Sequence, residues 1–231
     1  MYFDPSIILL LPAVVFAFIA QAQVNNAYNK YAKVRNKRGI TGAQAARAIL
    51  DRNGLSHIGV ETGKGRLSDH YDPRKKVIRL SPDVYSTASI ASVSIAAHEA
   101  GHAVQHASHY VPLVLRNTIV PVVNIGSMLS WPLIIIGILL VSAGHYYGEP
   151  VLYLGVIFFI GVVVFHAVTL PVEFNASGRA LAQMEEYGII YGEEKKSAKK
   201  VLSAAAMTYV AALAVAVANL LRILVILGRR D

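Results

Sequence analysis

The sequence predicts a mostly α-helical integral membrane protein with about four transmembrane helices and a small polar α+β portion. Three observations lead to this fold class. Hydrophobic residues make up 55% of the 231 positions, and they gather in four long apolar segments. A long polar stretch with its own helix and strand patterns separates the first two segments. We treat residues 1–231 as a single domain.

Each apolar segment approaches the roughly 20 residues that a helix needs to cross a bilayer. The two middle segments contain no Lys, Arg, Asp or Glu, which favours burial in lipid. The expected spans lie near residues 6–22, 119–143, 150–171 and 201–227.

The first apolar segment could instead be a cleaved signal peptide, because Ala20-Gln21-Ala22 resembles a small-residue cleavage site. However, residues 1–5 carry an aspartate and no basic residue, whereas a secretory signal normally begins with a positive region. We therefore expect an uncleaved anchor.

Basic residues indicate the orientation of the chain in the membrane. A cluster of them directly follows the first span, whereas the loop Gly144–Glu149 between the second and third spans has none. By the positive-inside rule, the segments 24–117 and 172–200 lie in the cytosol. The Arg229-Arg230 tail conflicts with this topology unless the last helix is tilted.

The net charge of +8 does not require a nucleic-acid partner. Lys and Arg beside membrane spans attract anionic lipid and set topology, so the expected partner of these charges is the lipid bilayer. The chain has no cysteine, which excludes disulfides and a cysteine nucleophile. Any bound metal must therefore be held by histidine, carboxylate or water.

The polar stretch begins with a short amphipathic helix and a β-hairpin. The run Thr41-Gly42-Ala43-Gln44 opens the helix, and Asn53-Gly54 closes it. Residues 66–71 and 76–81 predict two strands joined by the turn Asp72-Pro73-Arg74-Lys75. Since the second strand directly precedes the next helix, it either accepts an extended peptide as an added strand or only covers that helix.

The next helix is expected to begin at Ser86 or Thr87 and to end before Pro112. It carries the HExxH motif His98-Glu99-Ala100-Gly101-His102. Histidines four residues apart lie on one face of a helix and can bind one Zn²⁺, while the glutamate between them points toward the open metal position as a general base. The motif therefore predicts a hydrolytic zinc centre.

A catalytic zinc centre needs a third protein ligand and an open position for water. Glu173 stands where the third span ends, on the same predicted side of the membrane as the motif. It is the leading candidate, and a carboxylate hydrogen-bonded at headgroup level is the alternative. His106 continues the row of histidines, but three successive turns of a straight helix cannot easily reach one ion, so we expect it beside the ligands or at the surface.

Three motifs together resemble the YugP-type neutral zinc metallopeptidases of prokaryotic membranes. They are Asp69-His70-Tyr71-Asp72-Pro73, the segment 96–106 around the HExxH motif, and residues 170–177. The opening residues 1–5 and the stretch 204–212 resemble the same family, so the resemblance covers nearly the whole chain. The family is similar in layout to the heat-shock and prenyl-protein membrane metallopeptidases, whose third zinc ligand is a Glu on a later helix.

The resemblance implies a zincin-like cytosolic portion in which His98, His102 and Glu173 bind Zn²⁺ and Glu99 is the base. It also implies a zinc metalloendopeptidase that cleaves membrane or cytosolic proteins from the prokaryotic cytoplasmic membrane, with its active site facing the cytosol. Where the family leads us to expect Asp, the chain has Asn175. Asn can still orient a histidine by accepting a hydrogen bond.

Several further residues are candidates for supporting roles, with surface or packing roles as the competing interpretation. Arg179 could stabilise the transition-state anion or pair with a carboxylate, and His70 and Tyr71 could reach the substrate oxyanion. The alternative function is a non-catalytic zinc-binding membrane protein with a structural or assembly role, for which a fourth protein ligand is expected. Alanines of the last span suit helix packing within one chain or between copies, which leaves a homo-oligomer open.

Overall fold

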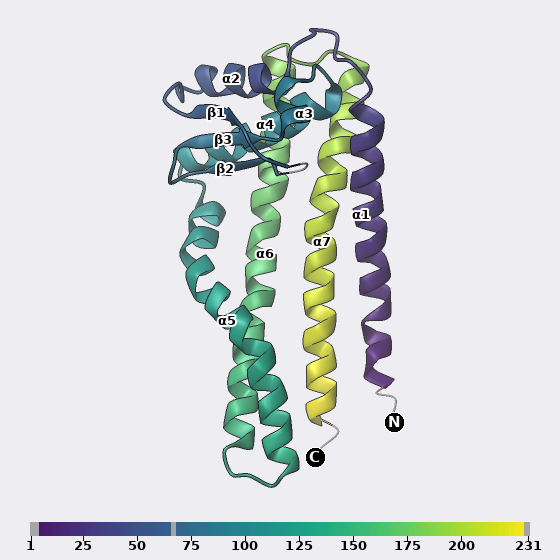
Figure 1. The fold of residues 1–231 in the computed structure, drawn as a ribbon, viewed down its shortest axis with the longest axis vertical. Helices are drawn as coiled ribbons and strands as arrows, with labels where there is room; N and C mark the ends of the chain where they lie inside the picture. The colour runs from purple at the N-terminus through teal and green to yellow at the C-terminus, as the bar shows by residue number, and fades with distance from the viewer. Residues whose placement is uncertain (1–4, 66–67, 229–231) are drawn as a thin grey trace. The chain divides into compact units, whose positions relative to one another are not determined.

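The computed structural model describes residues 5–65 and 68–228, and it is largely helical (Figure 1). The predictions that concern residues 1–4, Arg66 and Arg229-Arg230 lie outside the described residues. The elements in chain order are η1 (Pro5–Leu9), α1 (Leu11–Tyr31), α2 (Gly42–Arg52), β1 (Gly59–Thr62), β2 (His70–Asp72), β3 (Val77–Leu80), α3 (Pro82–Ser86), α4 (Ile90–Ala107), α5 (Val111–Ser142), α6 (Gly148–Glu186) and α7 (Glu193–Gly228).

Four candidate spans of the described chain are long and apolar enough to cross a membrane, which confirms the predicted number. They are longer than the apolar segments of the sequence: α6 continues past Pro171 to Glu186, and α7 already begins at Glu193. The polar extension of α7, residues 193–200, consists mostly of Glu and Lys. These are strong helix formers, so the helix continues where the hydropathy has already fallen.

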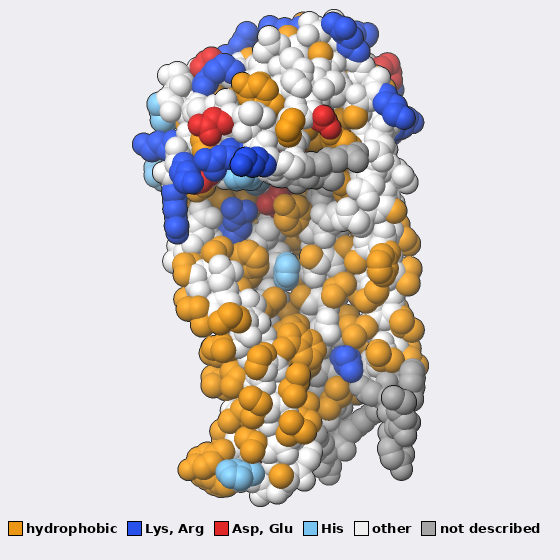
Figure 2. All heavy atoms as spheres, viewed as in Figure 1, with side chains coloured by type: hydrophobic (Ala, Val, Ile, Leu, Met, Phe, Trp, Pro, Cys, Tyr) orange, Lys and Arg blue, Asp and Glu red, His pale blue; other side chains and the backbone are white. Residues whose placement is uncertain are grey.

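The chain forms two compact units. The apolar unit comprises Met1–Ile19, Val114–Pro171 and Tyr209–Asp231, and the polar unit comprises Ala20–Leu113 and Val172–Thr208. The apolar unit leaves large hydrophobic side chains at its surface; Val122, Met128 and Leu139 of α5 are 63% to 71% exposed. Figure 2 shows such side chains over this unit, whereas Lys and Arg gather over the polar unit. This surface pattern is the one expected of a protein that lies in lipid.

The polar unit contains a three-stranded sheet of order β1-β3-β2. The predicted hairpin is confirmed, because β2 and β3 pair antiparallel with Tyr71 opposite Ile78. In the connecting turn, Asp72 Oδ1 accepts hydrogen bonds from the backbone N–H groups of Arg74 and Lys75. The strand β1, which was not predicted, pairs parallel with the other side of β3. Because β3 is the central strand, the prediction that it could accept a peptide is wrong; in the described part of this sheet, β1 and β2 are the edge strands.

The core of the polar unit joins the sheet to α2 and α4. Fully buried side chains from all three meet there, namely Ile49, Leu50, Ile78, Leu80, Ile90 and Val93. The predicted short helix is confirmed in α2, where Thr41 and Gln44 form a capping box. The predicted start of the motif helix is wrong: Thr87 is extended, and α4 begins at Ile90 after the cap Ser89.

The helices α4 and α6 approach closely within the polar unit. A Cβ atom added to Gly101 would lie 2.7 Å from the carbonyl oxygen of Ala176. Both Ala100 and Ala176 are fully buried. Only a residue without a side chain lets the two backbones come this close.

Replacing Gly101 by alanine should therefore destabilise the protein. Overpacking of this kind typically costs about 1–3 kcal/mol, which thermal unfolding in detergent can measure. Gly178→Ala on α6 is the matched control, because nothing lies within 4 Å of its added Cβ, and its melting temperature should be unchanged or higher. An unchanged melting temperature for Gly101→Ala would contradict the close packing described here.

Candidate metal centre

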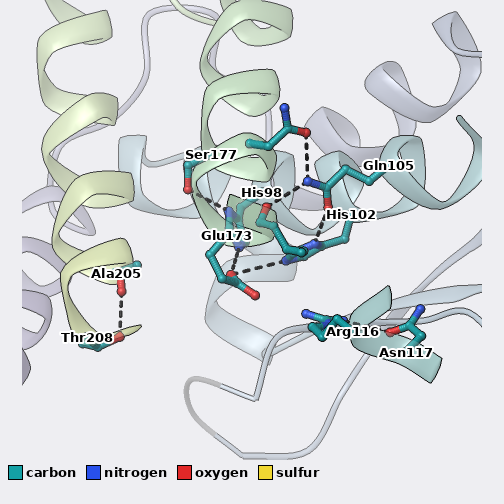
Figure 3. A network of polar contacts seen from close by, with 11 residues as sticks. His98, His102, Gln105, Arg116, Asn117, Glu173, Ser177, Ala205 and Thr208 are labelled. Carbon is teal, nitrogen blue, oxygen red and sulfur yellow. Dashed lines mark hydrogen bonds and ion pairs between the residues drawn. The ribbon is translucent and has the colours of Figure 1, made fainter. Parts of the chain in front are cut away.

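The predicted ligands His98, His102 and Glu173 come together in the polar unit (Figure 3). Glu173 Oε2 lies 3.3 Å from His98 Nε2 and 3.5 Å from His102 Nε2. All three potential ligand atoms are within 4.8 Å of one another. The α4 helix places both histidines on one face, and α6 brings the glutamate to that face.

The donor set and its spacing fit a zinc ion. Two imidazole nitrogens and one carboxylate oxygen are the ligands of many catalytic zinc sites. A tetrahedral ion at about 2.0–2.1 Å from each donor would hold the donors roughly 3.3–3.4 Å apart. The observed separations of 3.3 and 3.5 Å agree with this value. The Glu173 side chain is only 4% exposed, and a buried carboxylate needs a cationic or hydrogen-bonding partner.

The outer nitrogen of each histidine is held by a neutral side chain. His98 Nδ1 lies 3.1 Å from Ser177 Oγ, and His102 Nδ1 lies 3.0 Å from Gln105 Oε1. These contacts turn both Nε2 atoms toward Glu173. Sequence reasoning did not single out Ser177 and Gln105. Their helical spacing was the available signal, since Ser177 is four residues after Glu173 and Gln105 is three after His102.

Glu99 is buried on α4, where it is 9% exposed. Its charge acts on two neighbours. Burial by itself lowers the pKa of His102, but the hydrogen bond to Glu173 and the charges of Glu99 and Glu173 outweigh it, so this pKa is raised. Burial raises the pKa of Asp69, and the charge of Glu99 acts in the same direction. Glu99, the base predicted from the motif, thus lies close enough to Asp69 and His102 for its charge to act on both.

Asn175 and Arg179 extend the hydrogen-bond network of His102 beyond Gln105. Asn175 Oδ1 accepts a hydrogen bond from Gln105 Nε2 at 2.9 Å and another from Arg179 Nε at 2.8 Å. The Arg179 guanidinium lies over the Tyr110 ring, 5.9 Å from its centroid. Asn175 is therefore linked to His102 through Gln105.

Tyr71 and His106 form a pair beside the centre. The Tyr71 hydroxyl lies 3.0 Å from His106 Nδ1 and connects β2 with the last turn of α4. Burial raises the pKa of Tyr71, and the charge of Asp72 adds to the effect, so the hydroxyl keeps its proton. His70 is exposed, and its Nδ1 lies 2.8 Å from the carbonyl oxygen of Ser68.

The fold and the site together define a membrane protein with a possible His-His-Glu metal site on two helices. Residues 6–228 match the model of a protein family described as "Putative neutral zinc metallopeptidase". The chain therefore belongs to the neutral zinc metallopeptidase family. It is 46% identical over 226 residues to the "Putative membrane protease YugP" of Bacillus subtilis (strain 168), a match that covers 97% of this chain and 98% of that protein. No solved structure matches the chain.

Removal of the Glu173 carboxylate should abolish tight zinc binding, because it supplies one of the three donor atoms. Elemental analysis of purified Glu173→Ala after dialysis measures the zinc content. Glu185→Ala is the matched control, since Glu185 is an exposed residue of α6 that pairs with Lys195. Zinc retained by Glu173→Ala at the wild-type level would place the metal elsewhere.

Proposed function

We propose that the protein is a zinc-dependent endopeptidase that hydrolyses peptide bonds of membrane or cytosolic proteins. One observation carries the proposal: the buried Glu173 carboxylate faces the inner nitrogens of both HExxH histidines at 3.3 and 3.5 Å. Membership in a zinc metallopeptidase family and similarity to a protein named as a membrane protease support it.

In this proposal, His98, His102 and Glu173 hold the zinc ion. When bound, zinc polarises the scissile carbonyl group and lowers the pKa of a coordinated water. Glu99 accepts the proton that this water loses, at a carboxylate oxygen, and then donates it to the nitrogen of the departing amine. The burial of Glu99 supports this role because it keeps bulk water away from the carboxylate.

We also propose that substrate binds along the free edge of β2. Among the residues that the structure describes, β2 is an edge strand that pairs with β3, and it contacts α4. An extended peptide could add to the free edge through backbone hydrogen bonds. Tyr71, a protonated hydroxyl on this strand, is then a candidate to donate a hydrogen bond to the transition-state oxyanion. Arg179 is a second candidate, because Asn175 uses its Nε and a guanidinium has further N–H donors.

The positive-inside rule supports an active site on the cytosolic side of a prokaryotic cytoplasmic membrane. The metal centre is built from α4 and from the part of α6 that follows Pro171, within the segments flanked by basic residues. The bilayer is the expected partner of the four spans. A homo-oligomer through the alanine-rich face of α7 stays a prediction.

The alternative of a non-catalytic zinc protein depended on Asn175. The Asn175 Oδ1 atom accepts two hydrogen bonds, which an aspartate oxygen in the same place would also accept. Asn175 therefore keeps both hydrogen bonds of this oxygen and lacks only the charge of an aspartate. The structural or assembly role stays a prediction.

Glu99→Gln should retain zinc and lose proteolysis, because the amide keeps the size of the carboxylate but cannot accept the proton. General base catalysis is worth about 10²–10⁴-fold, so cleavage of casein or a peptide library in detergent should fall by at least 100-fold. The exposed Glu185→Gln should cleave like the wild type. If wild type and Glu99→Gln both bind zinc and neither cleaves any substrate, the structural or assembly role is favoured instead.

A further inference from the structure

We propose that Gln105 is a positioning residue that fixes the tautomer and the direction of His102, and that Asn175 and Arg179 set its orientation from α6. The inference deepens the proposed function, because it concerns how the zinc ligand is prepared. It rests on four linked side chains, Arg179, Asn175, Gln105 and His102, in which each hydrogen bond has only one possible donor.

A backbone carbonyl group is the first partner that fixes the orientation of the Gln105 amide. Gln105 is completely buried, and its Nε2 atom donates a hydrogen bond to Val172 O at 2.8 Å. A carbonyl oxygen can only accept, so the amide nitrogen of Gln105 must face Val172. The amide oxygen consequently faces His102 Nδ1, at 3.0 Å.

A guanidinium group, which can only donate, fixes the orientation of the Asn175 amide. Arg179 Nε donates to Asn175 Oδ1 at 2.8 Å, so the amide oxygen of Asn175 must face Arg179. The same oxygen accepts from Gln105 Nε2 at 2.9 Å. Val172 and Asn175, both on α6, therefore require the same orientation of the Gln105 amide, with its nitrogen toward α6.

The consequence for His102 follows from the acceptor that it meets. Because Gln105 Oε1 has no proton to give, His102 Nδ1 must carry the hydrogen. In the neutral imidazole the lone pair is then on Nε2, which lies 3.5 Å from Glu173 Oε2. His102 is thus held in the one neutral form that can bind a metal beside Glu173.

The tautomer of His98 is not fixed in this way. Its Nδ1 meets Ser177 Oγ at 3.1 Å, and a hydroxyl can either donate or accept. Ser177 therefore aligns the His98 ring without choosing its tautomer. The two zinc ligands differ in this respect, and the directional partner belongs to His102.

The test is zinc affinity, measured by competition with a chelator in the absence of any substrate. Gln105→Met removes the amide at nearly constant volume and should weaken zinc binding about 10- to 100-fold. Gln183→Met is the matched control and should bind zinc like the wild type, because Gln183 is a partly buried amide of α6 that bonds a different residue, Asn53.

A second measurement on the wild type needs no substitution and decides the matter if Gln105→Met fails to fold. Nitrogen NMR of the histidines in the zinc-loaded protein should show a protonated Nδ1 and a metal-bound Nε2 for His102. A metal-bound Nδ1 would overturn the inference, as would a folded Gln105→Met protein with wild-type zinc affinity.

These outcomes are separable from the fate of the proposed function. A wild-type protein that binds zinc through His102 Nε2 but cleaves nothing would refute the peptidase and leave the positioning role standing. An active enzyme whose zinc affinity does not depend on Gln105 would do the reverse. A wild-type protein that binds no zinc would refute both.

Discussion

The candidate metal site depends on the contact between the backbones of α4 and α6 at Gly101 and Ala176. A Cβ atom added to Gly101 would lie 2.7 Å from the carbonyl oxygen of Ala176, so this position has no space for a side chain. Glu173 and Ser177 lie on either side of Ala176 in the sequence, so this contact brings both within reach of the histidines. Close helix packing therefore determines the geometry of the ligands, because interiors packed at crystal-like density transmit such constraints.

Polar interactions hold the surrounding chain of the polar unit in place. The Arg38 guanidinium donates to the carbonyl oxygens of Tyr187 and Gly188, which follow the end of α6. The carboxylate of Glu194 accepts hydrogen bonds from the backbone N–H groups of Lys37 and Tyr191. These contacts join the segment after α1 to the connection between α6 and α7. The carbonyl oxygens that follow α6 and the N–H group of Tyr191 before α7 thereby gain the partners that groups at helix ends lack within the helix itself.

Much of this arrangement could be predicted from the sequence, because the relevant signals are local. Apolar length predicted the spans, and the spacing of His98 and His102 predicted a shared helix face. Glu173 required topology and family resemblance in addition. The central position of β3, the separate helix α3 and the partners Ser177 and Gln105 were missed. The central position of β3 and the contact of Ser177 depend on segments far apart in the chain, which neither periodicity nor composition encodes. Gln105 and α3 had local signals, namely the spacing of Gln105 from His102 and the proline in the first turn of α3.

The three candidate ligands are unequally exposed to solvent. The side chains of His98 and His102 keep 15% and 14% of their surface open, whereas Glu173 keeps 4%. The candidate site is therefore more open on the side of the two histidines than on the side of the carboxylate. If the proposed zinc binds there, the packing of α4 against α6 already holds its ligands, so uptake of the ion needs no refolding, unlike in small domains whose fold forms only around the metal.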